Sequence, residues 1–361
     1  MSVRLAALAW LGLALAGQLE SAPRLDLICA YEAPKDLSAA GAPFGGISGI
    51  DYDRQRGVWL MISDDRSDRA PARFHVGRLD YDAEGIRGLT IERSTALRRE
   101  DGSTFPSSQA EEGERVDAEA IRLDPLTGDL VWSSEGDFPH GHDPSLRRMT
   151  LDGAPMGGIP LPPAFAFDRS GLSGARPNLT VEGLTFAPDG RSLWVSMEAP
   201  LIQDGPVASV RTGAPVRLIR MDRQGVVLAE YAYQLDPIQA APAAGLRADN
   251  GLSEILAIDD HRLLVLERSG VETAKGQFVY HCRLYLVDTR RGGTPSEASP
   301  RALEKQLLIN FDRLQGVGPA NLEAMAWGPS LASGERTLVL VSDDNFDPGS
   351  PTRILVFAVR P

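Results

Sequence analysis

The sequence predicts an all-β fold in which one unit is repeated along the chain. The clearest copy is the stretch 178–200, NLTVEGLTFAPDGRSLWVSMEAP, where two apolar runs flank Pro188-Asp189-Gly190. Proline presets φ for a turn and glycine accepts a positive φ, so the triplet predicts a β-hairpin. Similar hairpins recur along the chain, and no stretch after the N-terminus has the 3.6-residue apolar period of a helix. These observations indicate a repeat protein made of strands.

Five hairpins are predicted, and each is followed by room for two more strands. The hairpins cover 46–63, 117–134, 181–197, 252–266 and 321–342. The added strands are predicted at 73–81 and 86–94, at 146–151 with a weak candidate near Phe165, at 216–222 and 226–233, at 278–288 and 304–311, and at 353–359. The last repeat is therefore one strand short.

The apolar run 25–32 is the candidate for the missing strand. An N-terminal strand that completes the last repeat would close a ring and remove the sheet edges. Four strands repeated about five times with ring closure predict a β-propeller of five four-stranded blades. Six blades are the alternative, if an insertion such as 102–115 or 239–250 hides a degenerate repeat. We expect 25–361 to form a single domain.

Residues 1–16 have the pattern of a secretory signal peptide. Arg4 precedes an apolar run over 5–15, and Ala14-Leu15-Ala16 provides an A-x-A cleavage site. The run is shorter than the roughly 20 apolar residues of a membrane-spanning helix. An uncleaved membrane anchor is the alternative. We therefore expect an exported protein that is not held in the membrane after cleavage.

Composition limits the partners. The formal charge is -12 and the pI about 5.0, which argues against nucleic acid because phosphate-backbone binding needs clustered Lys and Arg. An acidic protein suits cations, and it would need a metal or local arginines to bind an anionic substrate. The two cysteines, Cys29 and Cys282, could pair in an oxidising compartment or remain two separate buried thiols.

Acidic residues recur in register on the first strand of each hairpin. The column consists of Ser48, Glu119, Glu182, Glu254 and Glu323, spaced 71, 63, 72 and 69 residues apart. In a propeller these strands line the central channel, so the five side chains are predicted to form an inward-facing ring. Like charges about 4 Å apart repel by roughly 4 kcal/mol at an effective dielectric constant near 20.

A hard divalent cation would relieve that repulsion. Calcium accepts 6–8 oxygen ligands in flexible geometry, whereas zinc prefers nitrogen or sulfur. The column therefore predicts a Ca²⁺ ion on the axis. The alternative is that these glutamates accept hydrogen bonds from amides of neighbouring inner strands or from water.

A second acidic column follows the second strand of each hairpin. It consists of Asp64, Asp65, Glu135, Glu198, Glu267, Asp343 and Asp344, with Arg66 and Arg268 each directly after an acid. Such a rim could orient a phosphate or sulfate ester, because arginine grips oxyanions in bidentate fashion. Ion pairs within the rim that only brace the loops are the alternative.

The blocks that carry these columns resemble a known family. GISGIDYD, DAEAIRLDPLTGDLVWSSEG, GLSEILAIDDHRLLVLERS and the stretch 178–199 resemble the phytase-like domain, described as the esterase-like activity of phytase, over about 44–359. The resemblance implies a secreted or periplasmic bacterial protein with ester or phosphate-ester hydrolysis. The ring is more distantly similar to that of calcium-activated nucleotidases, which implies that its five residues are the metal shell. Lysine-rich phosphate grips like those of alkaline β-propeller phytases are absent, which puts phytate itself in doubt.

Two functions follow from this pattern. The first is a calcium-dependent hydrolase of a small phosphate or other ester, with Glu198 or Glu267 as the base and Arg66 or Arg268 stabilising charge. The second is a non-catalytic periplasmic propeller that binds a ligand or protein partner and uses its axial metal only for structure. We expect a monomer in either case.

Overall fold

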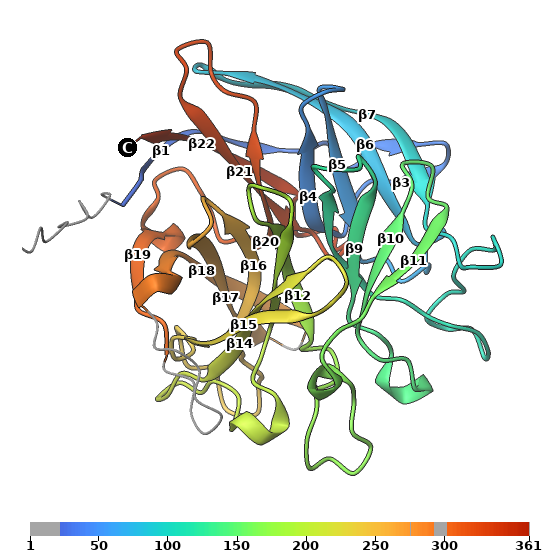
Figure 1. The fold of residues 1–361 in the computed structure, drawn as a ribbon. Coiled ribbons are helices and arrows are strands. Elements are labelled where there is room, and N and C mark those ends of the chain that lie inside the picture. The colour runs from blue at the N-terminus through green and yellow to red at the C-terminus, as the bar shows by residue number, and fades with distance from the viewer. Residues whose placement is uncertain (1–21, 275, 292–301, 361) are drawn as a thin grey trace, which may run out of the picture.

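The computed structural model describes residues 22–274, 276–291 and 302–360, and it confirms the five-bladed β-propeller (Figure 1). The first blade contains β4 (Ile47–Asp53), β5 (Val58–Ser63), β6 (Arg73–Asp82) and β7 (Gly85–Ala96). The second contains β8 (Ala118–Leu123), β9 (Leu130–Ser134), β10 (Ser145–Met149) and β11 (Pro155–Ile159). The third contains β12 (Val181–Phe186), β13 (Ser192–Met197), β14 (Pro215–Asp222) and β15 (Val227–Gln234). In each blade the strands pair antiparallel in chain order.

The last two blades complete the ring. The fourth contains β16 (Gly251–Ala257), β17 (Arg262–Ala274), β18 (Gln277–Asp288) and β19 (Lys305–Asn310). The fifth contains β20 (Asn321–Gly328), β21 (Arg336–Asp343) and β22 (Arg353–Arg360), and its outer strand is β1 (Arg24–Glu32). Figure 1 shows the blue β1 beside the red β22, and their ladder runs from Arg24↔Arg360 to Glu32↔Arg353. The predicted closure by the N-terminal strand is confirmed.

One predicted detail of the blades is wrong, and the six-bladed alternative is excluded. The outer strand of the second blade is β11, of sequence PMGGI, and not a strand near Phe165, which lies in the short 3-10 helix Pro163–Phe165. A proline and two glycines are poor strand formers, so the local pattern hides this strand. The segments 102–115 and 239–250 contain no strand beyond isolated bridges, so neither hides a sixth blade.

Apolar side chains fill the spaces between neighbouring blades. One cluster joins β5 and β6 of the first blade to β8 and β9 of the second through Phe74, Ile121 and Trp132. Another joins the fifth blade to the first through Ile50, Val339 and Val356. Because neighbouring blades cover each sheet, second strands such as β5 and β13 are buried on both sides and show little alternation, whereas outer strands such as β7 and β15 are partly exposed. This packing holds the five inner strands at fixed positions around the axis.

Each inner strand has one extra residue near its start. In β4 the ladder passes from Ile47↔Ser63 directly to Gly49↔Ile62, so Ser48 bulges out of it. The strands β8, β12, β16 and β20 have the same irregularity at the equivalent place. A bulge re-aims the side chain at that point of the strand. The position that directly follows the last paired residue is Ser48, Glu119, Glu182, Ser253 and Glu323 in the five blades.

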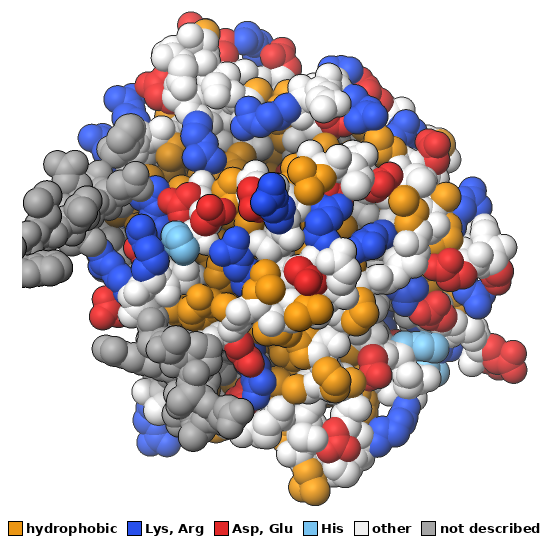
Figure 2. Space-filling view, in the orientation of Figure 1, with side chains coloured by type: hydrophobic (Ala, Val, Ile, Leu, Met, Phe, Trp, Pro, Cys, Tyr) orange, Lys and Arg blue, Asp and Glu red, His pale blue; other side chains and the backbone are white. Residues whose placement is uncertain are grey.

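The longer connections lie on the face where the inner strands begin. They include 97–117 before β8 and 235–250 before β16, and the loops around β12 and β13 extend below the sheets in Figure 1. Figure 2 shows positive and negative side chains interspersed over the visible face, with no continuous basic patch. The surface in this view therefore offers no footprint for a phosphate backbone.

The predicted signal segment 1–16 lies outside the described residues. Among the described residues, no helix has the length and apolar character needed to cross a bilayer. Cys282 is buried and Cys29 is half-buried, and both are free thiols, so of the two alternatives the structure has the unpaired one.

Candidate active site

Both acidic columns converge at one end of the propeller axis. The inner bulge positions and the residues that follow the second strands meet there, where the inner strands begin. We call this group of eight carboxylates the acidic cluster: Asp64, Asp117, Glu119, Glu135, Glu182, Glu198, Glu323 and Asp343. The sequence analysis treats the columns as two features, an inward-facing ring and a rim, whereas the structure brings members of both into one site.

Two overlapping triads form the densest part of the acidic cluster. Asp117, Glu119 and Glu135 each present a carboxylate oxygen within 4.8 Å of the others, and so do Glu135, Glu182 and Glu198. Glu135 belongs to both triads. These triads lie between the second and third blades, and all five side chains come from the ends of β8, β9, β12 and β13. The triads therefore form a continuous acidic surface.

Burial and mutual repulsion perturb these carboxyl groups. Desolvation is the main cause that raises the pKa of Glu119, Glu135 and Glu182 well above the usual value, and neighbouring acids raise it further. The same causes raise the pKa of Asp64 and Asp343. Without a counter-charge the cluster therefore holds protons that exposed carboxyl groups would lose.

Glu198 and Asp117 titrate closer to neutral pH because each is near an arginine. Desolvation raises the pKa of Glu198 to about 7, while the charge of Arg268 opposes it. Desolvation also raises the pKa of Asp117 to about 6, opposed by Arg66. A carboxyl with a pKa near the working pH is suited to accept and return a proton.

The two predicted arginines border the acidic cluster. Arg268 Nη2 donates to Glu198 Oε1 at 2.8 Å, and its Nε lies 3.5 Å from Glu323 Oε1. Arg66 Nη1 lies 3.4 Å from Asp117 Oδ2. Arg66 has a φ of 52° and the following Ser67 a φ of 60°, which is strained for residues other than glycine. This turn directs Arg66 toward the second blade.

The predicted register is wrong in the fourth blade. Leu252 pairs with Glu267 and Glu254 with Leu266, so Ser253 occupies the bulge position of the ring and Glu254 lies one residue further along. By the same shift Arg268, not Glu267, takes the place that acids hold in the other blades. The acidic cluster therefore lacks both glutamates of this blade and gains a positive charge.

Glu254 is neutralised on the axis by Arg122, which sequence reasoning missed. Arg122 Nη2 donates to Glu254 Oε2 at 2.6 Å, and Glu254 Oε1 accepts from the amides of Leu184 at 3.2 Å and Ile255 at 2.9 Å. The guanidinium also donates to carbonyl oxygens of all five inner strands, those of Ile50, Ile121, Leu184, Ile255 and Met325. Arg122 thus closes the channel below the acidic cluster.

Three further predicted acids are occupied by protein donors. Glu267 accepts from Tyr233 Oη at 2.7 Å, Asn250 Nδ2 at 3.0 Å, Lys305 Nζ at 2.5 Å and the amide of Asp236. Asp65 binds Arg73, and Asp344 accepts from the amide of Gly46 at 2.9 Å. These acids brace loops and blade contacts, as the alternative interpretation of the rim expects. The structure does not bring Glu267 into the cluster.

The remaining members of the ring fit a hard cation. Neither Glu119 nor Glu182 accepts a hydrogen bond from any described residue, in contrast to Glu254. Glu323 accepts from Asn321 Nδ2 at 2.9 Å and from Ser48 Oγ at 3.3 Å. The buried Asn321 Oδ1 has no partner among the described residues. The atoms here that could bind a metal are all oxygens, the ligand type that Ca²⁺ and Mg²⁺ prefer.

Asp117 is the site residue that the sequence analysis did not select. It directly precedes the inner strand of the second blade, where Gly46, Thr180, Gly251 and Asn321 stand in the other blades. Because this position is not acidic elsewhere, no repeat pattern marks it. Its place two residues before Glu119, a spacing that in a regular extended segment puts both side chains on one face, is the signal that could have found it.

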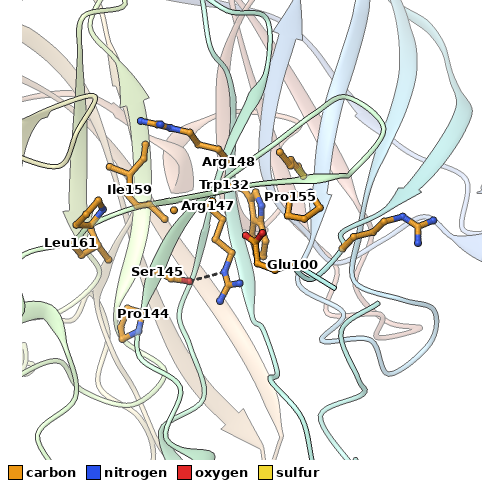
Figure 3. A pocket seen from close by; sticks show the side chains of 15 residues that line it. Glu100, Trp132, Pro144, Ser145, Arg147, Arg148, Pro155, Ile159 and Leu161 are labelled. Atoms are coloured by element: carbon orange, nitrogen blue, oxygen red, sulfur yellow. Dashed lines mark hydrogen bonds between the residues drawn. The ribbon is translucent and has the colours of Figure 1, made fainter. Parts of the chain in front are cut away.

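A separate pocket of about 500 Å³ lies on the outer strands of the second blade (Figure 3). Arg147, Trp132 and Glu100 line it, and Arg147 Nε donates to Ser145 Oγ at 3.1 Å. Arg147 also pairs with Glu114. The acidic cluster does not line this pocket, so we do not assign the pocket to the same site.

The fold and the acidic cluster define a five-bladed propeller with a buried polyacidic site at one end of its axis. A family model with the description "Phytase-like: Esterase-like activity of phytase" matches residues 42–346. The chain belongs to this family. The match includes every member of the acidic cluster. No curated protein matches the sequence significantly.

Several solved structures are similar to this chain over most of its length, at low identity. A protein of Bacteroides ovatus ATCC 8483, named as a candidate glycoside hydrolase, has 8% identity and a TM-score of 0.48, with 92% of each chain covered. An α-L-arabinofuranosidase from Lactobacillus brevis has 11% identity and a TM-score of 0.46, covering 88% of this chain and 91% of its own. Likenesses this remote do not bear on the activity of the chain.

Proposed function

We propose that this protein is an exported, metal-dependent hydrolase of small phosphate esters or other esters, with Ca²⁺ as the metal. The observation that carries the proposal is the pair of overlapping carboxylate triads beside two arginines. Membership in a family described by esterase-like activity of phytase supports the same class of reaction. The signal-like segment 1–16 supports export.

The carboxylates of Asp117, Glu119, Glu135 and Glu182 are those we propose to hold the cation, with Glu198 beside them. Their geometry fits because the oxygens of each triad lie within 4.8 Å of one another and Glu119 and Glu182 have no protein donor among the described residues. When bound, a divalent cation supplies positive charge that polarises a phosphoryl or acyl oxygen and lowers the pKa of a water. It also replaces the protons that burial otherwise forces on these acids.

Glu198 is the residue we propose as the general base. Its pKa of about 7 leaves it able to take a proton from water at neutral pH and to return it to the leaving group. Arg268 holds the carboxylate at 2.8 Å and keeps it oriented. Arg268 and Arg66 then supply the positive charge that an oxyanion of the substrate requires.

The test is turnover of the purified protein on a panel of esters. The panel contains p-nitrophenyl phosphate, bis-p-nitrophenyl phosphate, a nucleoside diphosphate, phytate and a short acyl ester, each with Ca²⁺ and with a chelator. We expect Ca²⁺-dependent turnover that Glu182→Gln reduces at least 100-fold, while Glu84→Gln on the exposed surface leaves it unchanged. Turnover that survives both chelation and Glu182→Gln would contradict the assignment.

The second candidate is a non-catalytic propeller that binds a ligand and uses its metal only for structure. The observation that favours it is the burial of Glu119, Glu135 and Glu182 above the Arg122 plug, which limits access of a substrate to the triads. In this case Ca²⁺ raises the melting temperature and none of the esters is hydrolysed.

A further inference from the structure

A second site lies at the other end of the propeller axis. All five inner strands run in one direction, so they begin at the end of the axis that holds the acidic cluster, and their last residues surround a pocket of about 310 Å³. Arg122 forms its floor and separates it from the acidic cluster. A cavity of this size is near the lower limit of small-molecule pockets in proteins.

Two arginines line this pocket without a carboxylate partner. Arg54 follows β4 and Arg336 begins β21, and neither forms an ion pair with any described residue. Arg54 Nη2 makes one contact, to the carbonyl of Gly328 at 3.4 Å. Burial lowers the pKa of Arg336 and the charge of Arg54 lowers it further, as expected for two cations that line one pocket. In a protein of net charge -12, no ion pair with a described residue explains why two arginines line this pocket.

The rest of the pocket is aromatic and aliphatic. The guanidinium carbon of Arg336 lies 3.9 Å from the centroid of the Trp327 ring, and Phe186, Leu256 and Ile258 complete the apolar wall. Trp327 Nε1 donates to the carbonyl of Ala257 at 2.8 Å, which fixes the indole. This wall presents rigid apolar surface beside two positive charges.

The one acid in the pocket is held by the main chain. Asp51 accepts from the amide of Leu123 at 2.8 Å and from that of Tyr52 at 2.9 Å. Burial raises the pKa of Asp51, and Arg122 opposes this effect. Asp51 therefore does not neutralise Arg54 or Arg336, and its own charge is balanced by the floor.

We propose that this pocket binds a small organic anion with one phosphate, phosphonate or carboxylate group and one flat apolar ring. Arg54 and Arg336 bind the anionic group, and Trp327 and Phe186 contact the ring. Arginine binds such oxyanions with two parallel hydrogen bonds, and aromatic walls favour flat ligands. The site is independent of the proposed hydrolase, because Arg122 closes the axis between the two.

The test is calorimetric titration of the full chain with phenylphosphonate in the presence of a chelator. Phenylphosphonate has a P–C bond and is not an ester, so hydrolysis cannot obscure binding. Benzoate, inorganic phosphate and benzyl alcohol serve as comparison ligands. We expect phenylphosphonate to bind at least tenfold more tightly than either inorganic phosphate or benzyl alcohol, and benzoate to report whether a carboxylate can replace the phosphonate.

Variants then test which end of the propeller axis binds the ligand. Arg54→Ala and Arg336→Ala should each weaken phenylphosphonate binding at least tenfold, and Arg336→Lys should weaken it less. Arg211→Ala, an exposed arginine in the loop after β13 on the other face, and Glu182→Gln should leave binding unchanged. Because the two pocket arginines are exposed, the variants should fold. Absence of binding to the wild-type protein, or a loss caused by Glu182→Gln and not by Arg336→Ala, would overturn the proposal.

Discussion

Replacing Glu198 with glutamine should make the stability of the metal-free protein less dependent on pH. Burial raises the pKa of Glu198 from 4.5 to about 7, although the Arg268 charge opposes this. The folded protein therefore binds this proton more tightly than the unfolded chain does. The stabilisation is complete below pH 4.5 and is lost as the pH rises through 7. At about 1.4 kcal/mol per pKa unit, the ionisation of this carboxyl lowers the free energy of unfolding by about 3 kcal/mol as the pH rises from 4.5 to above 7.

The assay is urea denaturation in chelator at pH 5 and pH 8. We expect the free energy of unfolding of the wild-type protein to fall between these pH values by about 2 kcal/mol more than that of Glu198→Gln. Glu135 and Glu182 lose the charge of Glu198 in the variant and titrate differently, whereas groups away from Glu198 titrate alike in both proteins and cancel in the difference. His75 is one of these groups. Burial lowers its pKa from 6.5 to about 3, so protonation of the unfolded chain lowers the stability as the pH falls below 6.5, which is opposite to the effect of Glu198.

Adding Ca²⁺ tests whether the acidic cluster binds a metal or only consists of buried acids that repel one another. A cation that binds only the folded state should restore the stability of the wild-type protein at pH 8 in proportion to its concentration. The exposed variant Glu84→Gln should have the wild-type pH dependence. Identical pH dependence of Glu198→Gln and wild type in chelator would refute the electrostatic account of the cluster.

Two further substitutions test the axis and the first blade. Arg122→Met should cost about 3–5 kcal/mol in urea denaturation because it leaves Glu254 buried without its partner, and adding Glu254→Gln should recover part of that loss. Full stability of the single variant would show that Arg122 is dispensable. Gly46→Ala would place a Cβ 2.3 Å from Asp64 Oδ1 at a φ of 58°, so in urea denaturation it should cost more than the roughly 1–3 kcal/mol of backbone strain alone. Gly41→Ala, which has a φ of 81° in open space, is the matched control and should cost only that strain.

The blade architecture could be predicted because local signals agree with the global fold. Turn triplets such as Pro188-Asp189-Gly190 separate runs of β-formers, and the hairpin predicted over 181–197 begins where β12 begins and ends where β13 ends. The closing strand β1 was predicted from the strand missing in the last repeat. The outer strand β11 was missed because PMGGI is held in place by its neighbour β10 and not by its own propensity.

The site was less predictable because it depends on a bulge. A bulge inserts one unpaired residue into a strand, and no residue type in the sequence marks where it occurs. In the fourth blade the glutamate beside the bulge, Glu254, looked like the ring member, whereas the ladder puts Ser253 there. A shift of one residue reverses the direction of a strand side chain. Arg122 was missed for a different reason, since a lone arginine in an apolar strand gives no hint that five carbonyl oxygens meet around it.

The departure of the fourth blade from the repeat makes the site asymmetric. The positions after the second strands carry four acids and one arginine, Arg268, and the bulge positions carry three glutamates and two serines. Negative charge is therefore densest between the second and third blades, where Glu135 joins both triads. Positive charge lies across from it on the fourth blade and, through Arg66, on the first. A symmetric ring of five acids could only hold a cation. A ring with Arg268 in place of one acid can also orient an anion against that cation, which is the arrangement that the proposed ester hydrolysis would use.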